Sequence, residues 1–231
     1  MFTKASRNRL IDLFSKIVFK DRPVLITLTY PRVFPCPDRA KEHLDAFLKR
    51  MKRRCPRSSG VWRMELQKRG APHFHLIMFH LPFIPKGEIQ AMWEAVISSD
   101  IVWNKEIGLF TRIEAIRTAR GVMFYASKYL AKSGGLNNDA YLTAVGEYVH
   151  PVTLETCWVG RWWGVFNRTD LPVGEEWTML VEIDDTPFLI FRCKAAEVFQ
   201  KINEYRWRGF TLYVENAEDW LNLWLDLLIA S

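Results

Sequence analysis

The stretch from Val61 to His80 constrains the fold more than any other part of the chain. Two runs rich in β-branched and aromatic residues, Val61–Gln67 and His73–His80, flank a short segment, Lys68–Pro72, that contains a glycine and a proline. Runs of this composition predict β-strands, and the segment between them predicts a turn. We therefore expect an antiparallel β-hairpin, so the fold must include a sheet.

The segments on either side of the hairpin predict the rest of the fold. Val24–Tyr30 lies between two prolines and has strand composition, and Asp38 is a suitable N-cap for a helix that runs to about Arg54. Further along, the pattern predicts a helix, a strand and a second helix that ends at a pair of glycines: Gly87–Ser98, Leu109–Ile116 and Thr118–Lys132. The order β-α-β-β-α-β-α predicts an α+β fold, with an antiparallel or mixed sheet covered by helices, of ferredoxin or RNA-recognition type.

Length and composition allow one generous core with a possible small addition. The chain has 231 residues, of which 49% are hydrophobic. The pattern is clear up to about residue 137 and weaker afterwards, where Cys157–Phe166 still predicts a strand. We therefore expect a main domain at residues 1–137, and a C-terminal α/β extension at 138–231 that either completes the fold or forms a small accessory domain.

The formal net charge is +6 and the sequence pI is about 9.2, which favours a polyanionic partner such as nucleic acid. The four cysteines lie far apart and form no C-x-x-C pair, so neither a zinc ribbon nor a redox motif is indicated. We expect reduced thiols in a cytoplasmic protein. No signal peptide or membrane-spanning segment is expected, because no apolar run is long enough.

The hairpin carries a set of metal-ligand side chains. Residues two apart on a strand share a face, so His73 and His75 project together and Phe74 points into the core. A hairpin folded about Gly70 places Glu65 opposite His75 and Gln67 opposite His73. Two imidazoles and a carboxylate can hold a divalent cation and leave positions for water or substrate, with Mn²⁺ bound more tightly than Mg²⁺. Two half-buried core histidines are the alternative.

The helix predicted at Thr118–Lys132 carries a second pattern. Tyr125, Lys128, Tyr129 and Lys132 lie on one stripe, and each tyrosine has a lysine one turn later. A protonated tyrosine is a weak nucleophile, and a nearby ammonium favours its phenolate form and can hold a phosphate oxygen. An amphipathic helix with interfacial tyrosines and solvated lysines would show the same spacing.

Three motifs occur in the same order as in a known superfamily: Thr27-Leu28-Thr29, His73-Phe74-His75 and Tyr125-x-x-Lys128-Tyr129-x-x-Lys132. The chain in this respect closely resembles the HUH endonucleases, in particular rolling-circle replication initiators (Rep proteins) of small phages and plasmids. The tyrosine pattern is similar to the two-tyrosine class. The resemblance covers roughly residues 22–135, and Gly160-Arg161-Trp162-Trp163-Gly164 is similar to a segment found downstream in related initiators.

The resemblance implies a central antiparallel sheet of about five strands and a role for each motif. His73 and His75 would be metal ligands, with Glu65 as the third ligand and Gln67 as its rival. Tyr125 and Tyr129 would be the nucleophiles, assisted by Lys128 and Lys132, and the metal would be Mn²⁺ or Mg²⁺. We further expect DNA contacts from five residues that are basic or aromatic: Arg63, Lys68, Arg69, Arg161 and Trp162.

The implied activity is nicking and rejoining of single-stranded or hairpin origin DNA through a 5′-phosphotyrosine, in a bacterial or archaeal cytoplasm. Because no phosphate-binding G-x-x-x-x-G-K-[ST] loop occurs, unwinding would need a host helicase, and a host polymerase would extend the 3′-hydroxyl. We expect a monomer or weak oligomer. Alternatives are a transposase or relaxase with the same chemistry, a nucleic-acid-binding module without catalysis, and a metal-binding core unrelated to DNA.

Overall fold

The computed structural model describes residues 3–17, 22–101, 111–115 and 139–174. All of them lie in the first of the two compact units of the chain, Met1–Gly174. The predicted tyrosine helix and most of the C-terminal extension therefore lie outside the described residues. Within the described ranges, no helix is long and apolar enough to cross a membrane.

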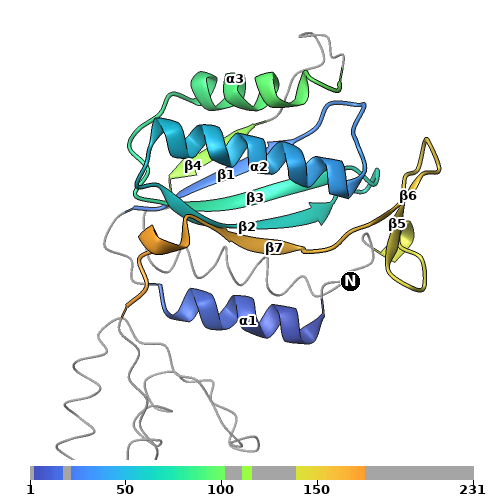
Figure 1. The fold of residues 1–231 in the computed structure, drawn as a ribbon, viewed down its shortest axis with the longest axis horizontal. Helices are drawn as coiled ribbons and strands as arrows, with labels where there is room; N and C mark the ends of the chain where they lie inside the picture. The colour runs from blue at the N-terminus through green and yellow to red at the C-terminus, as the bar shows by residue number, and fades with distance from the viewer. Residues whose placement is uncertain (1–2, 18–21, 102–110, 116–138, 175–231) are drawn as a thin grey trace, which may run out of the picture. The chain divides into compact units, whose positions relative to one another are not determined.

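The central element is a five-stranded sheet in which every neighbouring pair is antiparallel, with the strand order β4-β1-β3-β2-β7 (Figure 1). This confirms the predicted α+β class with a five-stranded antiparallel sheet and flanking helices. The hairpin predicted from the sequence forms the β2–β3 pair near the middle of this sheet. The strands are β1 (Val24–Thr29), β2 (Ser59–Leu66), β3 (Pro72–Phe79), β4 (Arg112–Ala115) and β7 (Trp163–Phe166).

Helices cover both faces of the sheet. α2 (Pro37–Arg54) and α3 (Lys86–Ile97) lie on one face, and α1 (Lys4–Ser15) lies on the other (Figure 1). A separate two-stranded sheet pairs β5 (Glu147–Val149) with β6 (Thr156–Trp158), flanked by the short 3₁₀ helices η2 (Asp139–Tyr141) and η3 (Arg168–Asp170).

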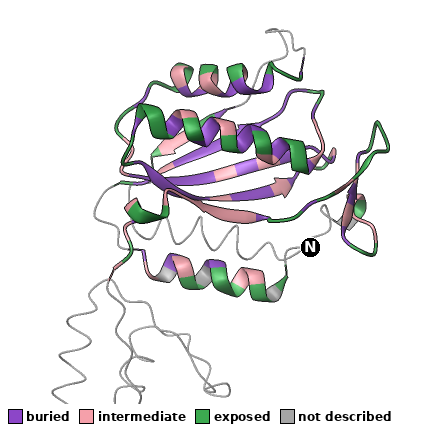
Figure 2. Cartoon of the chain, in the orientation of Figure 1, coloured by how far each residue is buried: buried purple, intermediate pink, exposed green. Residues whose placement is uncertain are grey.

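Alternation along the strands divides the buried residues into two cores (Figure 2). Phe74, Leu76 and Met78 of β3 enter the larger core, which α2 and α3 complete with residues such as Phe47 and Trp93. The opposite face of the same strands forms a smaller core with α1, made of Leu10, Phe14, Ile17, Leu25, Val61, Ile77, Phe79 and Leu171. Since α1 occupies only one half of that face, the other half carries polar side chains.

Three predicted boundaries differ from the structure. Cys36, not Asp38, is the N-cap of α2, and Asp38 lies in the first turn because Pro37 takes the first helical position, which needs no N–H. The strand predicted over Cys157–Phe166 is two strands, β6 and β7, separated by a segment that contains Gly160 in the left-handed region (φ 64°). Of the predicted strand Leu109–Ile116, the described part is β4.

A buried polar chain ties the end of β1 to both helices of the larger core. The Tyr30 hydroxyl lies 2.9 Å from His43 Nδ1, and His43 Nε2 lies 3.0 Å from Asp100 Oδ2. Burial lowers the pKa of His43, and hydrogen bonds from Arg39 hold the pKa of Asp100 below its usual range. The imidazole is therefore neutral: Nε2–H donates to Asp100 and Nδ1 accepts from Tyr30, so no formal ion pair with Asp100 forms.

We predict that the free energy of unfolding falls as the pH is lowered below about 6.5, the ordinary pKa of an exposed histidine. The folded chain keeps His43 neutral there while the unfolded chain binds a proton, so acid favours unfolding. Urea unfolding at several pH values, followed by circular dichroism, measures this slope. The His43→Gln variant should show a shallower slope between pH 7 and 5, and an unchanged slope would contradict the assignment.

We also predict that Gly60→Ala destabilises the sheet by about 1–3 kcal/mol. A Cβ at Gly60 would lie 2.6 Å from the Ile77 carbonyl oxygen, and that backbone is fixed by the β2–β3 pairing. Gly87→Ala in α3 is the matched control, because a Cβ there meets no atom within 4 Å. Thermal unfolding of both variants should show a loss for Gly60→Ala and no loss for Gly87→Ala; equal effects would contradict this view of the β2–β3 packing.

Candidate active site

The polar half of the α1-covered face brings together His73 and His75 from β3 and Glu65 from β2. Glu65 is the cross-strand partner of His73, and Arg63 is the partner of His75. Thr29 and Thr27 occupy the matching positions on β1. Directly paired residues on neighbouring strands share a face, so these side chains lie together across three adjacent strands.

The predicted pairing of Glu65 with His75 and of Gln67 with His73 is wrong by two residues. The turn is centred on Arg69 and not on Gly70, with Leu66 opposite Pro72, and Gly70 adopts φ 84° as the chain returns. A shift of two residues keeps every side chain on its original face. The predicted convergence therefore survives, although the individual partners change.

The three candidate ligands are close but not yet arranged as a coordination shell. The His75 Nε2 atom lies 3.6 Å from Glu65 Oε2, and the rings of His73 and His75 are 4.4 Å apart between centroids. Both His75 and Glu65 are nearly buried, at 12% and 13% side-chain exposure. The donor set of two imidazoles and a carboxylate suits a divalent cation. Rotation of the His73 side chain would complete the set.

Thr27 helps to orient His75, a role not foreseen from the sequence. Its Oγ1 lies 3.4 Å from His75 Nδ1. With the proton on Nδ1 and directed toward this hydroxyl, the Nε2 lone pair points to the side of Glu65, where a metal would be held. Outer partners of this kind fix the tautomer of metal-binding histidines. The Thr27-Leu28-Thr29 motif was the available signal, because it places two hydroxyls on the histidine face.

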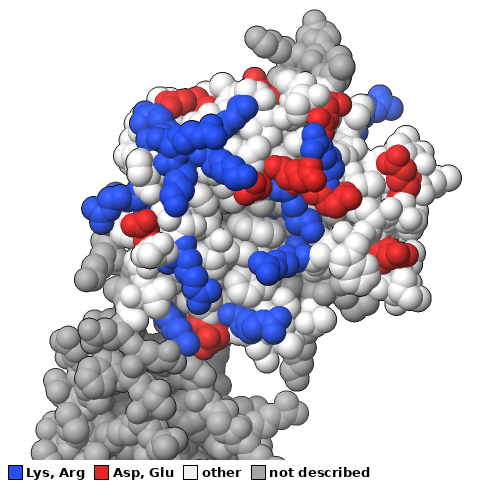
Figure 3. Space-filling model, in the orientation of Figure 1, with Lys and Arg blue, Asp and Glu red and all other residues white. Residues whose placement is uncertain are grey.

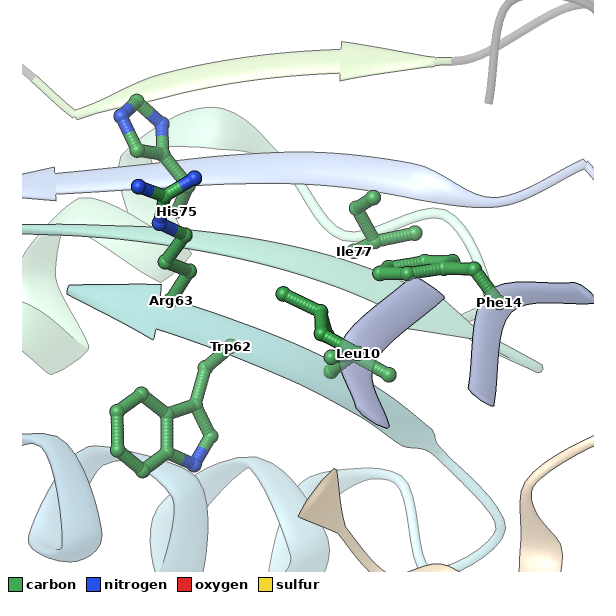
Figure 4. A pocket seen from close by; sticks show the side chains of 7 residues that line it. Leu10, Phe14, Trp62, Arg63, His75 and Ile77 are labelled. Carbon is green, nitrogen blue, oxygen red and sulfur yellow. The ribbon is translucent and has the colours of Figure 1, made fainter. Parts of the chain in front are cut away.

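Arg63 adds a buried positive charge to this group. It is 5% exposed, and its Nη2 lies 3.6 Å from Glu65 Oε1. A pocket beside it lies where the polar and apolar halves of the face meet. Figure 4 shows Arg63 and His75 at one end of this pocket, with Leu10 and Phe14 of α1 toward the other end. A guanidinium next to a cation-binding set favours an anionic group between them.

The β2–β3 turn that carries the site is held by backbone contacts from two directions. Arg69 donates from its Nη2 to the Tyr30 carbonyl at 2.7 Å and from Nη1 to the Pro31 carbonyl at 2.6 Å. Tyr148 of β5 donates to the Gly70 carbonyl at 2.9 Å, and Tyr141 donates to the Lys68 carbonyl at 2.6 Å. These bonds fix the turn immediately beside His73.

Gln67, the rival third ligand, lies in the same turn. Its Nε2 atom is 3.5 Å from His73 Nδ1, and its Oε1 accepts a hydrogen bond from Arg69 Nε at 3.0 Å. The amide oxygen, which is the atom that would bind a metal, is therefore already engaged. Glu65 is the better placed of the two for ligation.

The predicted DNA contacts have different surroundings. Lys68 and Arg161 are exposed and remain candidates. Arg69 is occupied by the turn, where its guanidinium also stacks 4.9 Å from the Phe34 ring centroid and burial lowers its pKa. Trp162 is not free for base stacking as predicted, because it is 4% exposed and belongs to the larger core. Trp158 on β6 is 65% exposed and was missed.

The basic run of α2 forms a surface on the other side of the sheet. Figure 3 shows lysine and arginine side chains gathered over the C-terminal half of this helix. Several have local partners: Lys49 lies 2.6 Å from Asp45, and Arg54 lies 2.8 Å from Glu88. Since α2 packs on the face opposite to His73, this surface is not part of the candidate active site.

The four residues of the tyrosine motif lie outside the described residues, so their roles stay predictions: Tyr125, Lys128, Tyr129 and Lys132. The same holds for metal binding by His73, His75 and Glu65, whose proximity the structure describes.

Comparison with known protein families gave one match. Residues 23–134 match the family of the replication-associated protein ORF2 and the gene II protein, over a little under half of the chain. The match supports a Rep-type protein of rolling-circle replication and suggests DNA binding, and its range includes the candidate site. The comparisons with curated proteins and with solved structures gave no match.

We predict that Glu65→Gln lowers the affinity for Mn²⁺ by at least about 10-fold, since a charged ligand is lost while the shape is kept. Gln67→Ala should change the affinity little, because its amide oxygen is bound to Arg69. Isothermal titration calorimetry with Mn²⁺ measures both constants. If Gln67→Ala weakens binding and Glu65→Gln does not, the amide and not the carboxylate is the third ligand.

Proposed function

We propose that this chain is a divalent-metal-dependent nickase and strand transferase for single-stranded DNA, which initiates and ends rolling-circle replication through a tyrosine nucleophile. The observation that carries the proposal is the convergence of His73, His75 and Glu65 on one polar half-face of the sheet. The Rep-type family match over residues 23–134 supports the replicative role.

In the proposed mechanism, His73, His75 and Glu65 would hold Mn²⁺ or Mg²⁺. The cation, when bound, would polarise the scissile phosphodiester and offset the charge that develops on its oxygens. Thr27 keeps the His75 ring oriented, and the β2–β3 turn keeps His73 in position. These contacts reduce the reorganisation that would otherwise accompany substrate binding.

Arg63 would hold a non-bridging phosphate oxygen of the same phosphodiester. Its buried guanidinium is beside His75 and Glu65, and a divalent cation bound there would repel it unless an anion were shared. A DNA phosphate supplies that anion. The charge pattern of the site therefore favours phosphoryl transfer over reactions of neutral substrates.

The tyrosine step follows from the sequence motif. The hydroxyl oxygen of Tyr125 or Tyr129 attacks phosphorus, so that a tyrosine O–P bond forms and the P–O3′ bond breaks. The tyrosine proton leaves, assisted by Lys128 or Lys132, and the departing 3′-oxygen takes up a proton to become a 3′-hydroxyl. The 5′-phosphotyrosine conserves the phosphoryl bond, so rejoining by the reverse attack of a 3′-hydroxyl needs no nucleotide cofactor.

We predict a covalent adduct between the protein and labelled single-stranded DNA in the presence of Mn²⁺. The chain is incubated with a random-sequence oligonucleotide pool, with Mn²⁺ or with a chelator, and the products are resolved on denaturing gels. His73→Ala and the double variant Tyr125→Phe/Tyr129→Phe should reduce the adduct by at least about 100-fold, because each removes a group needed for the bond-forming step.

Two matched variants control for general damage. His80→Asn changes a histidine just beyond the same strand, at φ 52°, a conformation that asparagine tolerates. Tyr141→Phe removes a tyrosine hydroxyl that only supports the turn. Both should keep most of the adduct. If DNA binding persists but no metal-dependent adduct forms with any oligonucleotide, the chain is a binding module and the nickase proposal is wrong.

A further inference from the structure

A second group of metal-ligand side chains lies away from the histidines. Cys36, Asp38 and Cys157 each offer one ligand atom, and these atoms all lie within 4.8 Å of one another. Among the described residues, this is the one group of three such side chains that meets that limit. Cys36 ends the proline-rich loop after β1, Asp38 lies in the first turn of α2, and Cys157 is the middle residue of β6.

The two cysteines belong to a different part of the fold from the candidate active site. Both pack against the larger core, on the side of the sheet that α2 and α3 cover. The histidines lie on the opposite face, with α1. A cation at Cys36 and Cys157 would therefore be distinct from the one proposed to act on DNA.

The donor set suits a borderline-soft divalent cation. Two thiolates and a carboxylate are ligands of Zn²⁺, with water available for the fourth position. Bond lengths of about 2.0–2.3 Å place the ligand atoms of a tetrahedral site roughly 3.3–3.8 Å apart. The observed limit of 4.8 Å therefore requires only small side-chain rotations. One Asp38 oxygen accepts the Arg39 N–H at 2.8 Å, which leaves the other oxygen for the cation.

The surrounding charges match such a complex. Two thiolates, one carboxylate and a divalent cation together carry one negative charge. The ammonium of Lys41 donates to the Val159 carbonyl beside this group, and it interacts electrostatically with Cys157 and Asp38. Lys41 would therefore neutralise the bound complex.

The thiols are not arranged as a reactive pair. Burial, followed by the neighbouring Cys157, raises the pKa of Cys36 to about 12, and burial also raises the pKa of Cys157. A protonated thiol is a poor nucleophile and exchanges disulfides slowly. Ligation to a cation is the chemistry that remains open to two such thiols beside a carboxylate.

A cation here would reinforce a weak part of the fold. β5 and β6 are three residues each, and an isolated two-stranded sheet of this size is marginal in water. Tyr148 of β5 holds the Gly70 carbonyl, and His150 lies 3.1 Å from the Phe34 carbonyl. The hairpin thus supports both the β2–β3 turn and the loop before α2.

We propose that Cys36, Asp38 and Cys157 bind one Zn²⁺-like divalent cation, which joins the start of α2 to the β5–β6 hairpin as a structural clip. This site is independent of the nicking activity proposed above. It would act through stability and through the position of the turn that bears His73, with no part in the bond-making steps.

The test is a titration of the full chain with Co²⁺ under a non-thiol reductant. Cobalt bound to thiolates gives a sulfur-to-metal charge-transfer band in the near ultraviolet, which imidazole and carboxylate ligands do not produce. The wild-type chain should show this band, saturating at one equivalent. His73→Ala should keep it, which separates the clip from the histidine site.

Cys36→Ser and Cys157→Ser should each lose most of the band, and Cys55→Ser should retain it. Cys55 is a matched control, because it is a free, buried cysteine of the same core that lies outside the cluster. Asp38 is exposed, and Asp38→Asn leaves both thiols in place, so this variant should weaken Zn²⁺ binding at least about 10-fold in a competition assay. No thiolate band in the wild type, or a band that survives both cysteine substitutions, would overturn the proposal.

Discussion

The alternation of side chains along β3 is the constraint on which the rest of the structure depends. Phe74, fully buried between two histidines of intermediate exposure, anchors the strand in the core under α2 and α3. With Phe74 fixed, His73 and His75 must both project to the opposite face. β1 and β2 pair with β3 on both sides, so their threonines, Arg63 and Glu65 reach that same face without any loop having to place them. A site built on three paired strands is positioned by the sheet itself.

The covering of that face explains why a polar site can exist there. α1 packs its apolar residues over one half only, against residues such as Val61, Ile77 and Phe79. The other half keeps charged groups that would be costly to bury without partners, and the nearly buried Arg63 and Glu65 lie within reach of each other. The boundary between the two halves forms the pocket beside His75. Helix length and placement therefore decide where apolar packing ends and chemistry can begin.

The sequence predicted most of the sheet because strand composition and a period of two are local signals. It predicted the correct face for Glu65 and both histidines, but not their pairing. Register depends on how many residues close the turn, and the bonds from Arg69 to the carbonyls after β1 come from a distant segment. Trp162 was misjudged for a similar reason, since its burial follows from the pairing of β7 with β2. The closeness of Cys36 and Cys157 was likewise invisible, because 120 intervening residues separate two unremarkable cysteines.

The turn between β2 and β3 connects these local and distant effects. Its carbonyls are held by Tyr141 and Tyr148, and its Arg69 side chain holds the carbonyls of the loop that leads to Cys36. The loop, the hairpin and the turn therefore form one closed set of contacts around the end of the sheet where His73 lies. Loss of any one contact would free backbone groups next to the candidate ligands. A site that must hold a cation and a phosphate together needs this rigidity, because small displacements of a ligand weaken both interactions at once.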